Sequence, residues 1–225
     1  MIQMGVLDGD GVTGLGVKYI VSGKSLKLQC EKLGLRISRV ELSIQGAKVE
    51  HALLPHLSAD VTTKWFYTEN NFYSFILGSM LYPIFSQLGV SSPFGVFENN
   101  LEDDVIGGFT LDYFNTTLEE MTAHKLSYED RSGGGYCDIE TDYLIKIYKG
   151  VGFEFFRKMV VLEFGHGGSC NIGWPDLIGV NATGVKFIEV KKKDNLTFGQ
   201  VCNFPLIVES GMELNVFVVT VLKPS

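Results

Sequence analysis

The stretch between positions 176 and 191 brings two carboxylates and an ammonium into one predicted hairpin. Residues 176–180 and 185–191 each read as a short strand, because they are apolar or rich in β-branched residues, and the Asn-Ala-Thr-Gly between them is typical of a tight turn. Asp176 begins the first strand, and Glu189 and Lys191 stand near the end of the second. Side chains alternate along a strand, so positions 189 and 191 point to the same face. The three charged groups are therefore expected to converge at one end of the antiparallel pair.

This combination of groups suits metal-assisted hydrolysis of a phosphodiester. Carboxylate oxygens from Asp176 and Glu189 are ligands that Mg²⁺ and Mn²⁺ prefer, with several waters left on the ion. Such an ion lowers the pKa of a bound water and neutralises charge that grows on the phosphate. Lys191 beside it would orient that water and stabilise the pentavalent phosphorus. Each feature alone is common in structural settings, since Pro-Asp often starts a strand and Glu-x-Lys often faces solvent. Together on one hairpin they predict a site that hydrolyses a nucleic-acid backbone.

The same stretch resembles the PD-(D/E)XK nucleases, and within them the VRR-NUC domain. That domain carries Gly-x-Pro-Asp-Leu, then Glu-Val-Lys on the next strand, and then a loop that ends Leu-[Ser/Thr]-x-x-Gln at a helix start. The matching positions here are Gly173, Pro175, Asp176, Leu177, Glu189, Val190, Lys191, Leu196, Thr197 and Gln200. The resemblance implies an α/β fold with an αβββαβ core, in which a mixed sheet is flanked by helices. It also implies that the backbone carbonyl of Val190 joins Asp176 and Glu189 as a metal ligand.

The loop after the second strand departs from the family pattern. Lys192 and Lys193 replace the usual Gly-Pro, and the loop is one residue shorter. These two lysines are the candidate contacts with the DNA backbone. Gln200, beyond the loop, has two interpretations. Thr197 followed three residues later by a glutamine is a capping box, which needs no catalytic role, whereas the resemblance places Gln200 among the catalytic residues.

A further carboxylate is expected on a helix, and two residues compete for that role. The chain resembles the nuclease region of the Fanconi-associated nucleases in the order Val-Glu-His-Ala-Leu-Leu, Tyr-Thr-Glu-Asn before an apolar helix, and Phe-Thr-Leu-Asp-Tyr-Phe. By this likeness Glu69 stands where that family has a metal-binding glutamate, although the histidine and both glycines of the family's His-Gly-Glu-Gly are absent. A glutamate there also suits the positive N-terminus of a helix. Glu140 is the alternative, since short VRR-NUC domains carry this carboxylate just ahead of the catalytic strands.

The composition is that of an ordinary globular protein, with one unusual value. The 225 residues are 45% hydrophobic, yet the formal net charge is −7, whereas proteins that bind DNA on their own normally present a basic surface. Positive charge must therefore be local if DNA is the partner. The four cysteines form no Cys-x-x-Cys pair, which indicates a reducing, intracellular compartment, the nucleus if the cell is eukaryotic. The longest uncharged run, 70–97, is interrupted by Pro83 and polar residues, so we expect a buried helix and no membrane span.

Periodicity and turn residues place the remaining elements. Residues 1–47 are expected to be an extension of uncertain structure, and residues 48–225 a VRR-NUC-type nuclease domain with a helical insertion at about 98–150. The expected strands outside the hairpin are Arg36–Ser43, Lys158–Phe164 as the first core strand, and Glu213–Leu222. The expected helices are Lys24–Leu33, one beginning near Ala47, Asp112–Leu126, Asp138–Lys149 and one that ends at Ser210 before Gly211.

The resemblance implies a nuclease that cuts flapped or branched DNA during repair, including repair of interstrand crosslinks. It would act as a 5′ flap endonuclease and 5′-to-3′ exonuclease, with targeting supplied by repair-protein partners. Two alternatives remain open. A stand-alone VRR-NUC enzyme would resolve four-way (Holliday) junctions, and a catalytically inactive nuclease fold would serve as an interaction module.

Overall fold

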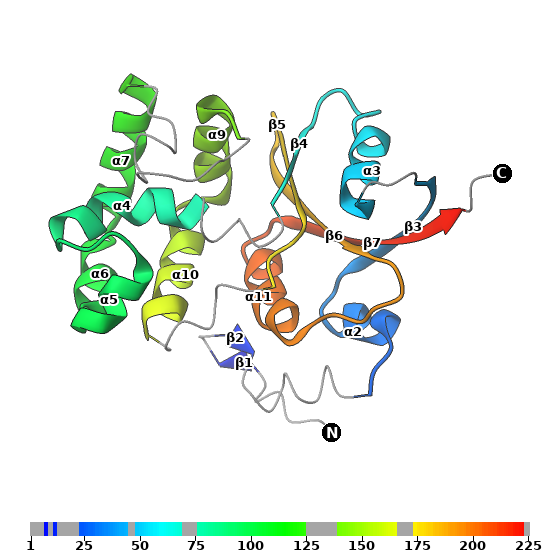
Figure 1. The fold of residues 1–225 in the computed structure, drawn as a ribbon, viewed down its shortest axis with the longest axis horizontal. Coiled ribbons are helices and arrows are strands. Elements are labelled where there is room, and N and C mark those ends of the chain that lie inside the picture. The colour runs from blue at the N-terminus through cyan, green and yellow to red at the C-terminus, as the bar shows by residue number, and fades with distance from the viewer. Residues whose placement is uncertain are drawn as a thin grey trace. The chain divides into compact units, whose positions relative to one another are not determined.

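The chain folds into two compact units (Figure 1). The computed structural model describes residues 7–8, 11–12, 23–44, 48–68, 76–124, 139–165 and 173–222. Unit 1 comprises residues 1–69 and 173–225, and unit 2 comprises residues 70–172. In the described parts, unit 1 contains all the strands and unit 2 contains only helices. The second unit is therefore an insertion into the first.

A five-stranded mixed sheet forms the centre of unit 1. Its spatial order is β3-β7-β6-β5-β4. Pairing is antiparallel from β4 through β5 to β6, and parallel from β6 through β7 to β3. The strands are β3 (Arg36–Ser43), β4 (Lys64–Tyr67), β5 (Leu177–Asn181), β6 (Gly184–Lys191) and β7 (Glu213–Leu222); a separate small hairpin joins β1 (Leu7–Asp8) to β2 (Gly11–Val12). This mixed sheet with flanking helices confirms the predicted fold class.

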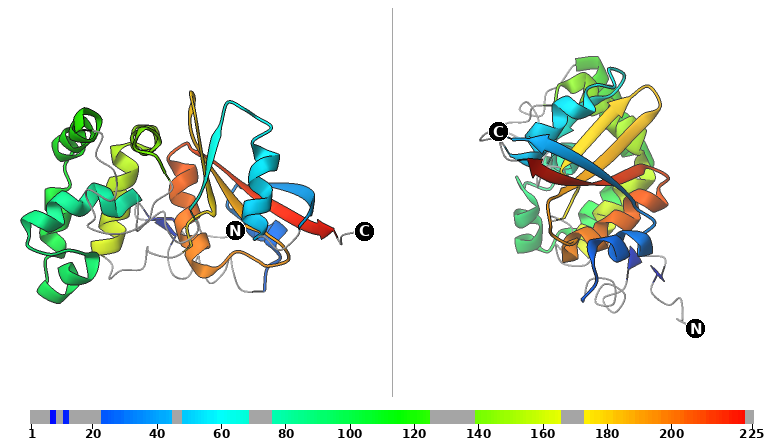
Figure 2. Two further views of the ribbon diagram at one scale, coloured as in Figure 1. Left: turned by 45° about the horizontal axis from the view of Figure 1, so that its top comes forward. Right: turned by 90° about the vertical axis from the view of Figure 1, so that its right-hand side faces the viewer.

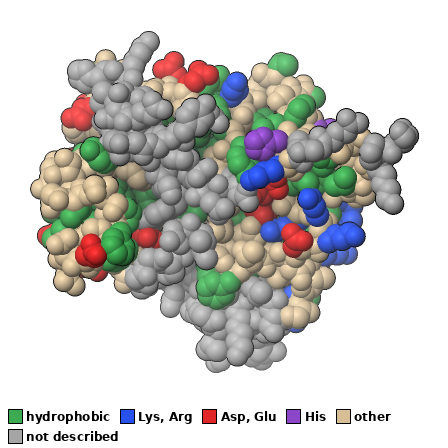
Figure 3. All heavy atoms as spheres, in the orientation of Figure 1, with side chains coloured by type: hydrophobic (Ala, Val, Ile, Leu, Met, Phe, Trp, Pro, Cys, Tyr) green, Lys and Arg blue, Asp and Glu red, His purple; other side chains and the backbone are tan. Residues whose placement is uncertain are grey.

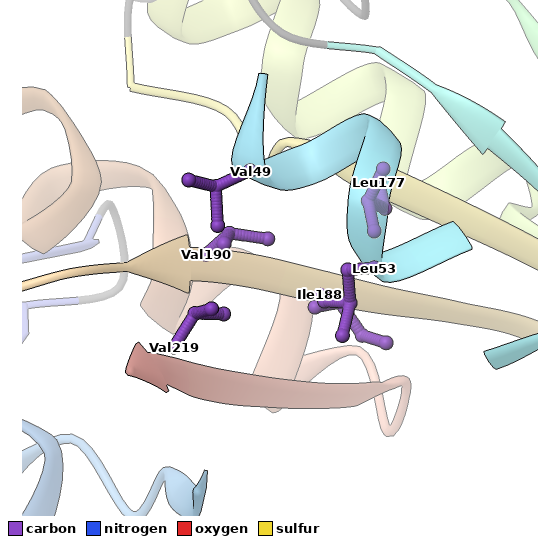
Figure 4. Packing of buried hydrophobic residues seen from close by; sticks show 6 residues of the cluster. All are labelled: Val49, Leu53, Leu177, Ile188, Val190 and Val219. Carbon is purple, nitrogen blue, oxygen red and sulfur yellow. The ribbon is translucent and has the colours of Figure 1, made fainter. Parts of the chain in front are cut away.

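Helix α3 (Val49–Leu57) covers one face of the sheet, and a single apolar cluster holds it there. Two residues of its inner side pack on three strands (Figure 4). The cluster consists of Val49, Leu53, Leu177, Ile188, Val190 and Val219. Since side chains alternate along β6, its Ile188 and Val190 face α3, and the residues between and after them face the other way.

Helices α2 (Leu26–Lys32) and α11 (Phe198–Glu209) lie on the opposite side of the sheet from α3 (Figures 1 and 2). Ser25 caps the first of these helices, and its end is followed by Gly34 in the left-handed region at φ 68°. The second begins at the Thr197 cap and connects β6 to the parallel strand β7. The chain segment between Lys191 and α11 therefore leads from the end of β6 back to the face of the sheet that carries α11 (Figure 1).

The predicted order of helix, strand, hairpin, helix and strand is present, but its first two elements lie elsewhere in the chain. Helix α3 and strand β4 supply them. The segment Lys158–Phe164, expected to be the first core strand, lies within helix α10 (Phe153–Gly165). Its β-branched run favours a strand when viewed alone. Residues 153–157 complete a helical repeat, because the buried positions are Phe155, Phe156, Met159, Val160, Glu163 and Phe164.

Unit 2 is built from helices that pack through aromatic side chains. Its remaining helices are α4 (Gly78–Gln87), α5 (Pro93–Asn99), α6 (Glu102–Gly108), α7 (Leu111–His124) and α9 (Thr141–Val151). Phe109 stacks on Phe153 at 5.7 Å between ring centroids, and Arg157 donates to backbone carbonyls of α6 and its C-cap. These helices begin well before the expected insertion start near 98. In the described part of the chain, no helix is both long enough and apolar enough to cross a bilayer.

Candidate active site

Asp176 is fixed by the three neighbouring strands on whose ends it lies. The Thr68 N–H, just after β4, donates to the Asp176 carbonyl at 2.7 Å, and the Thr68 hydroxyl donates to the Pro175 carbonyl at 3.0 Å. On the other side, the Val190 N–H of β6 donates to Asp176 Oδ2 at 2.7 Å. Asp176 itself directly precedes β5. Its carboxylate is therefore held at the sheet end beside the backbone of residue 190.

Glu189 has one saturated carboxylate oxygen and one that is buried without a partner. Lys191 Nζ lies 2.9 Å from Oε1, and Gln200 Nε2 donates to the same oxygen at 2.6 Å. Oε2 is buried and has no hydrogen-bond partner among the described residues. A buried acceptor left without a donor costs free energy, so native proteins rarely retain one without a function for it.

The pKa of Glu189 is raised to about 8, first by burial and then by the nearby Asp176 carboxylate. The Lys191 ammonium and the hydrogen bond from Gln200 act in the opposite direction. The carboxyl groups of Asp176 and Glu189 are thus close enough to repel each other. Two carboxylates that share a buried site are stabilised by any cation that binds between them.

The four residues predicted at the hairpin and helix start come together. Asp176, Glu189, Lys191 and Gln200 are 7%, 1%, 6% and 7% exposed. The capping box also forms, with the Gln200 N–H donating to Thr197 Oγ1 at 3.3 Å and the Thr197 N–H donating to Gln200 Oε1 at 2.9 Å. The two interpretations of Gln200 are therefore compatible, because one end of its amide caps α11 and the other contacts Glu189.

Glycine at position 173 lets the segment before Asp176 cross closely over the start of α11. Gly173 has φ 82°, and a Cβ built there would lie 2.3 Å from the Gly199 carbonyl carbon and 2.4 Å from the Gln200 nitrogen. Only glycine tolerates both the close approach and the left-handed conformation. The Gly-x-Pro-Asp pattern thus has a packing reason that the sequence does not reveal.

Gly173→Ala is expected to destabilise the protein by roughly 2–4 kcal/mol and to displace Gln200, since the added methyl group collides with backbone and not with a movable side chain. Chemical denaturation of the two proteins measures the change. Gly107→Ala is the control, because that position in α6 has nothing within 4 Å of the added Cβ. Equal stability of Gly173→Ala and the parent would show that the backbone at position 173 is not in close contact with the start of α11.

The remaining carboxylate candidates have different positions. Glu69 lies outside the described residues, so its role stays a prediction. Glu140 is the exposed N-cap residue of α9 in unit 2. The helix that precedes the first core strand is α3, and Glu50 is the acidic residue of its first turn. No group of three or more His, Cys, Asp or Glu side chains with metal-binding geometry occurs among the described residues.

Two residues beside the site carry no signal in the sequence. Thr68 holds the backbone of Pro175 and Asp176, but an isolated threonine after an aromatic run suggests only a turn or a cap. Cys30 of α2 is fully buried and close enough to Lys191 and Glu189 to interact with both charges; burial raises its pKa to about 11. More than 140 positions separate Cys30 from these residues, so only the fold reveals that they are neighbours.

The net negative charge of the chain comes from unit 2. Unit 1 carries 13 Lys and Arg against 12 Asp and Glu, whereas unit 2 carries 6 against 14. On the face shown in Figure 3, most of the visible Lys and Arg side chains lie over unit 1. Lys192 and Lys193 are exposed directly after the buried Lys191. The unit that contains the site therefore lacks the acidic excess of the whole chain.

Comparisons with known proteins identify the fold. No protein-family model and no curated protein matches this sequence. A crystal structure of paFAN1 bound to DNA with a 2-nucleotide 5′ flap and a gap matches with a TM-score of 0.61 and 17% identity, over 88% of this chain and 42% of that one. A second, of paFAN1 bound to DNA with a 1-nucleotide 5′ flap and a gap, matches with a TM-score of 0.54 and 16% identity, over 93% and 46%.

This chain thus spans less than half the length of the paFAN1 chains that it matches. At such low identity the likeness concerns the fold. The fold of this protein is similar to that of paFAN1, a Fanconi-associated nuclease, and the resemblance indicated by the motifs is confirmed at that level.

Proposed function

We propose that this protein is a metal-dependent, structure-selective DNA nuclease whose active site is formed by Asp176, Glu189, Lys191 and Gln200. The observation that supports this proposal most strongly is the state of Glu189. One of its oxygens receives two donors, while the other is buried beside a second carboxylate with no donor among the described residues. A purely structural glutamate would be expected to have both oxygens satisfied.

The residues present fit a Mg²⁺ or Mn²⁺ ion. The donor set consists of hard carboxylate oxygens, and Mg²⁺ is commonly held by one or two carboxylates together with waters and substrate phosphate. Glu189 Oε2 and the Asp176 carboxylate would hold the ion, with the Val190 carbonyl and Glu69 as further candidate ligands. Bound there, the ion would activate a water and neutralise charge on the phosphate.

The protein side chains have separable tasks in this proposal. Gln200 and Lys191 hold Glu189 by Oε1, which fixes the direction of Oε2. The Lys191 ammonium would also stabilise the negative charge that develops on the phosphoryl oxygens. The Val190 N–H holds Asp176 in place through Oδ2. Lys192 and Lys193 would contact the DNA phosphates, because they are exposed on the loop that leaves the site.

The proposed substrate is DNA with a 5′ flap. The two paFAN1 structures described above hold that protein on 5′-flapped DNA. By that likeness the cut would be that of a 5′ flap endonuclease with 5′-to-3′ exonuclease action, in DNA repair that includes interstrand crosslinks. Repair-protein partners would supply targeting.

Cleavage of end-labelled DNA in Mg²⁺ or Mn²⁺ tests the proposal. We expect 5′-flapped DNA to be cut faster than nicked duplex or a four-way junction. Faster cleavage of the junction would instead identify a junction resolvase, and absence of cleavage of all three with either cation would identify an inactive interaction module.

The raised pKa of Glu189 predicts how cation binding depends on pH. Since that pKa is about 8, a cation must displace a proton below pH 8, so the apparent affinity for Mn²⁺ is expected to rise about tenfold per pH unit from pH 6 to 8 and then level. Isothermal titration calorimetry at each pH measures it. Glu189→Gln should remove the dependence, and a flat profile for the parent would contradict the assignment.

The same shift makes a prediction for the metal-free protein. A carboxyl whose pKa is higher in the folded state than its usual 4.5 stabilises the fold at low pH, and this stabilisation is lost as pH rises toward 8. The contribution of Glu189 to the melting temperature should therefore fall between pH 5 and 8, and Glu189→Gln should lack this change. Adding Mn²⁺ should raise it more at pH 8.5 than at pH 6.

A further inference from the structure

Helix α2 supplies a buried glutamine that reaches the loop behind the site. Gln29 is fully buried, and its Oε1 accepts a hydrogen bond from the Leu196 N–H at 2.8 Å. The two residues are 167 positions apart. Leu196 belongs to the connection between Lys191 at the end of β6 and the Thr197 cap of α11. Helix α2 therefore fixes the backbone of the loop between β6 and α11, residues 192–197.

The next backbone N–H in that loop is held by the other glutamine. Thr197 N–H donates to Gln200 Oε1 at 2.9 Å, and the same amide donates from Nε2 to Glu189 Oε1 at 2.6 Å. Two consecutive N–H groups are thus fixed by two glutamine side chains from different helices. A shift of the Leu196–Thr197 backbone would move the Gln200 amide, and with it the donor on Glu189.

Gln29 retains one unsatisfied polar atom, which argues against a purely stabilising role. Its Nε2 is buried with no hydrogen-bond partner among the described residues. A buried unpaired donor is unfavourable, so the Nε2 atom gives no reason for a glutamine at this position. Among the described residues, the side chain is hydrogen-bonded through Oε1, to the loop between β6 and α11.

We propose that Gln29 is a positioning residue for the active site, acting through Leu196 and Thr197 on Gln200 and so on Glu189. This inference rests on the proposed nuclease function. It extends the active centre into the segment 1–47. The β3 strand that follows α2 pairs with β7 over eight residues, which anchors this segment to the sheet.

The test compares the parent protein with Gln29→Met, which keeps the side-chain length but removes the acceptor. Outer partners of metal ligands typically affect activity 10- to 100-fold, so kcat on 5′-flapped DNA is expected to fall about tenfold while KM changes less. The melting temperature should fall by only a few degrees, because the buried Leu196 N–H loses its acceptor. Gln87→Met, the same substitution at an exposed position of α4, should change neither.

A double-mutant comparison separates positioning from general damage. If Gln29 acts through Gln200, then Gln29→Met combined with Gln200→Ala should lose no more activity than Gln200→Ala alone. Multiplication of the two losses would overturn the proposal. If Gln29→Met does not fold, Gln29→Asn, whose shorter amide does not reach Leu196, carries the same comparison.

Hydrogen exchange gives a readout that does not depend on nuclease activity. The amide protons of Leu196 and Thr197 are expected to exchange at least about tenfold faster in Gln29→Met than in the parent, because the anchor of the loop is lost. Unchanged exchange would refute the positioning role even if the parent cuts DNA. Faster exchange in a protein that cuts no DNA would refute the nuclease function and leave the structural link intact.

Discussion

Asp176→Ala is expected to lower the rate of metal-dependent cleavage of 5′-flapped DNA at least about 1,000-fold while the protein stays folded. The substitution removes one of the two carboxylates proposed to hold the cation, and no other described acidic side chain completes a group of three. The fold should survive, because the backbone hydrogen bond from the Thr68 N–H to the residue 176 carbonyl does not depend on the side chain. Single-turnover cleavage and circular dichroism measure the two quantities.

Asp60→Ala provides the matched control for that loss. Asp60 is exposed in the turn between α3 and β4, and its carboxylate bonds only locally, to Thr62 and Thr63. Its removal should leave the cleavage rate within about twofold of the parent. Equal activity of Asp176→Ala and Asp60→Ala would mean that cleavage takes place elsewhere on the protein.

Lys191→Met should lower kcat by about 100- to 1,000-fold with a smaller effect on KM. The ammonium lies 2.9 Å from Glu189 Oε1 and is buried, so it acts on developing charge at a site that water screens poorly. Its loss would also raise the pKa of Glu189 further, because the ammonium favours the ionised carboxyl. Stability at pH 7 should fall little, since Glu189 can take up a proton.

Replacing the neighbouring lysines tests whether positive charge on the surface has a different effect from the buried positive charge of Lys191. Lys192 and Lys193 are exposed, so replacing both by alanine should raise KM and reduce the salt dependence of binding while kcat stays near that of the parent. Steady-state kinetics at two salt concentrations compare the variants. A loss of kcat in the double variant equal to that of Lys191→Met would contradict separate roles.

Local patterns were sufficient to predict the hairpin and the groups on it. Asp176, Glu189 and Lys191 follow from strand alternation and turn residues that lie within 16 positions, and β7 was predicted with its observed bounds. The sequence gives Gln200 two possible roles, in the capping box and in the active site. In the structure Gln200 bonds to the Thr197 N–H and to Glu189 Oε1 at the same time. Such features are encoded by neighbours in the chain.

Features that depend on distant segments were not predictable in this way. The first core strand β4 has four residues, too few to show a period, and unit 2 separates it from its partner β5 by more than 100 positions. The apolar, β-branched run 158–164 in α10 fits a strand pattern better than β4 does. The helical repeat becomes visible only when the residues before this run are included. Thr68, Cys30 and Gln29 meet the site through tertiary contacts that leave no pattern in the sequence.

The distribution of charge illustrates the same limit. A net charge of −7 argues against a DNA-binding protein when it is assigned to the whole chain. Division of the chain into its two units moves the acidic excess to the inserted helices and leaves the sheet unit with one more basic than acidic residue. The boundaries of these units follow from packing, so the charge of each unit can be calculated only once the fold is known.

The most direct test of the proposed site is a crystal of the protein soaked in Mn²⁺, with the metal located by its anomalous scattering. We expect a peak at about 2.1 Å from both Glu189 Oε2 and the Asp176 carboxylate, which would give the buried unpartnered oxygen its ligand. The peak should be absent from crystals of Asp176→Ala treated in the same way. A parent crystal without Mn²⁺ between these two carboxylates, at a concentration that supports DNA cleavage in solution, would contradict the proposed metal site.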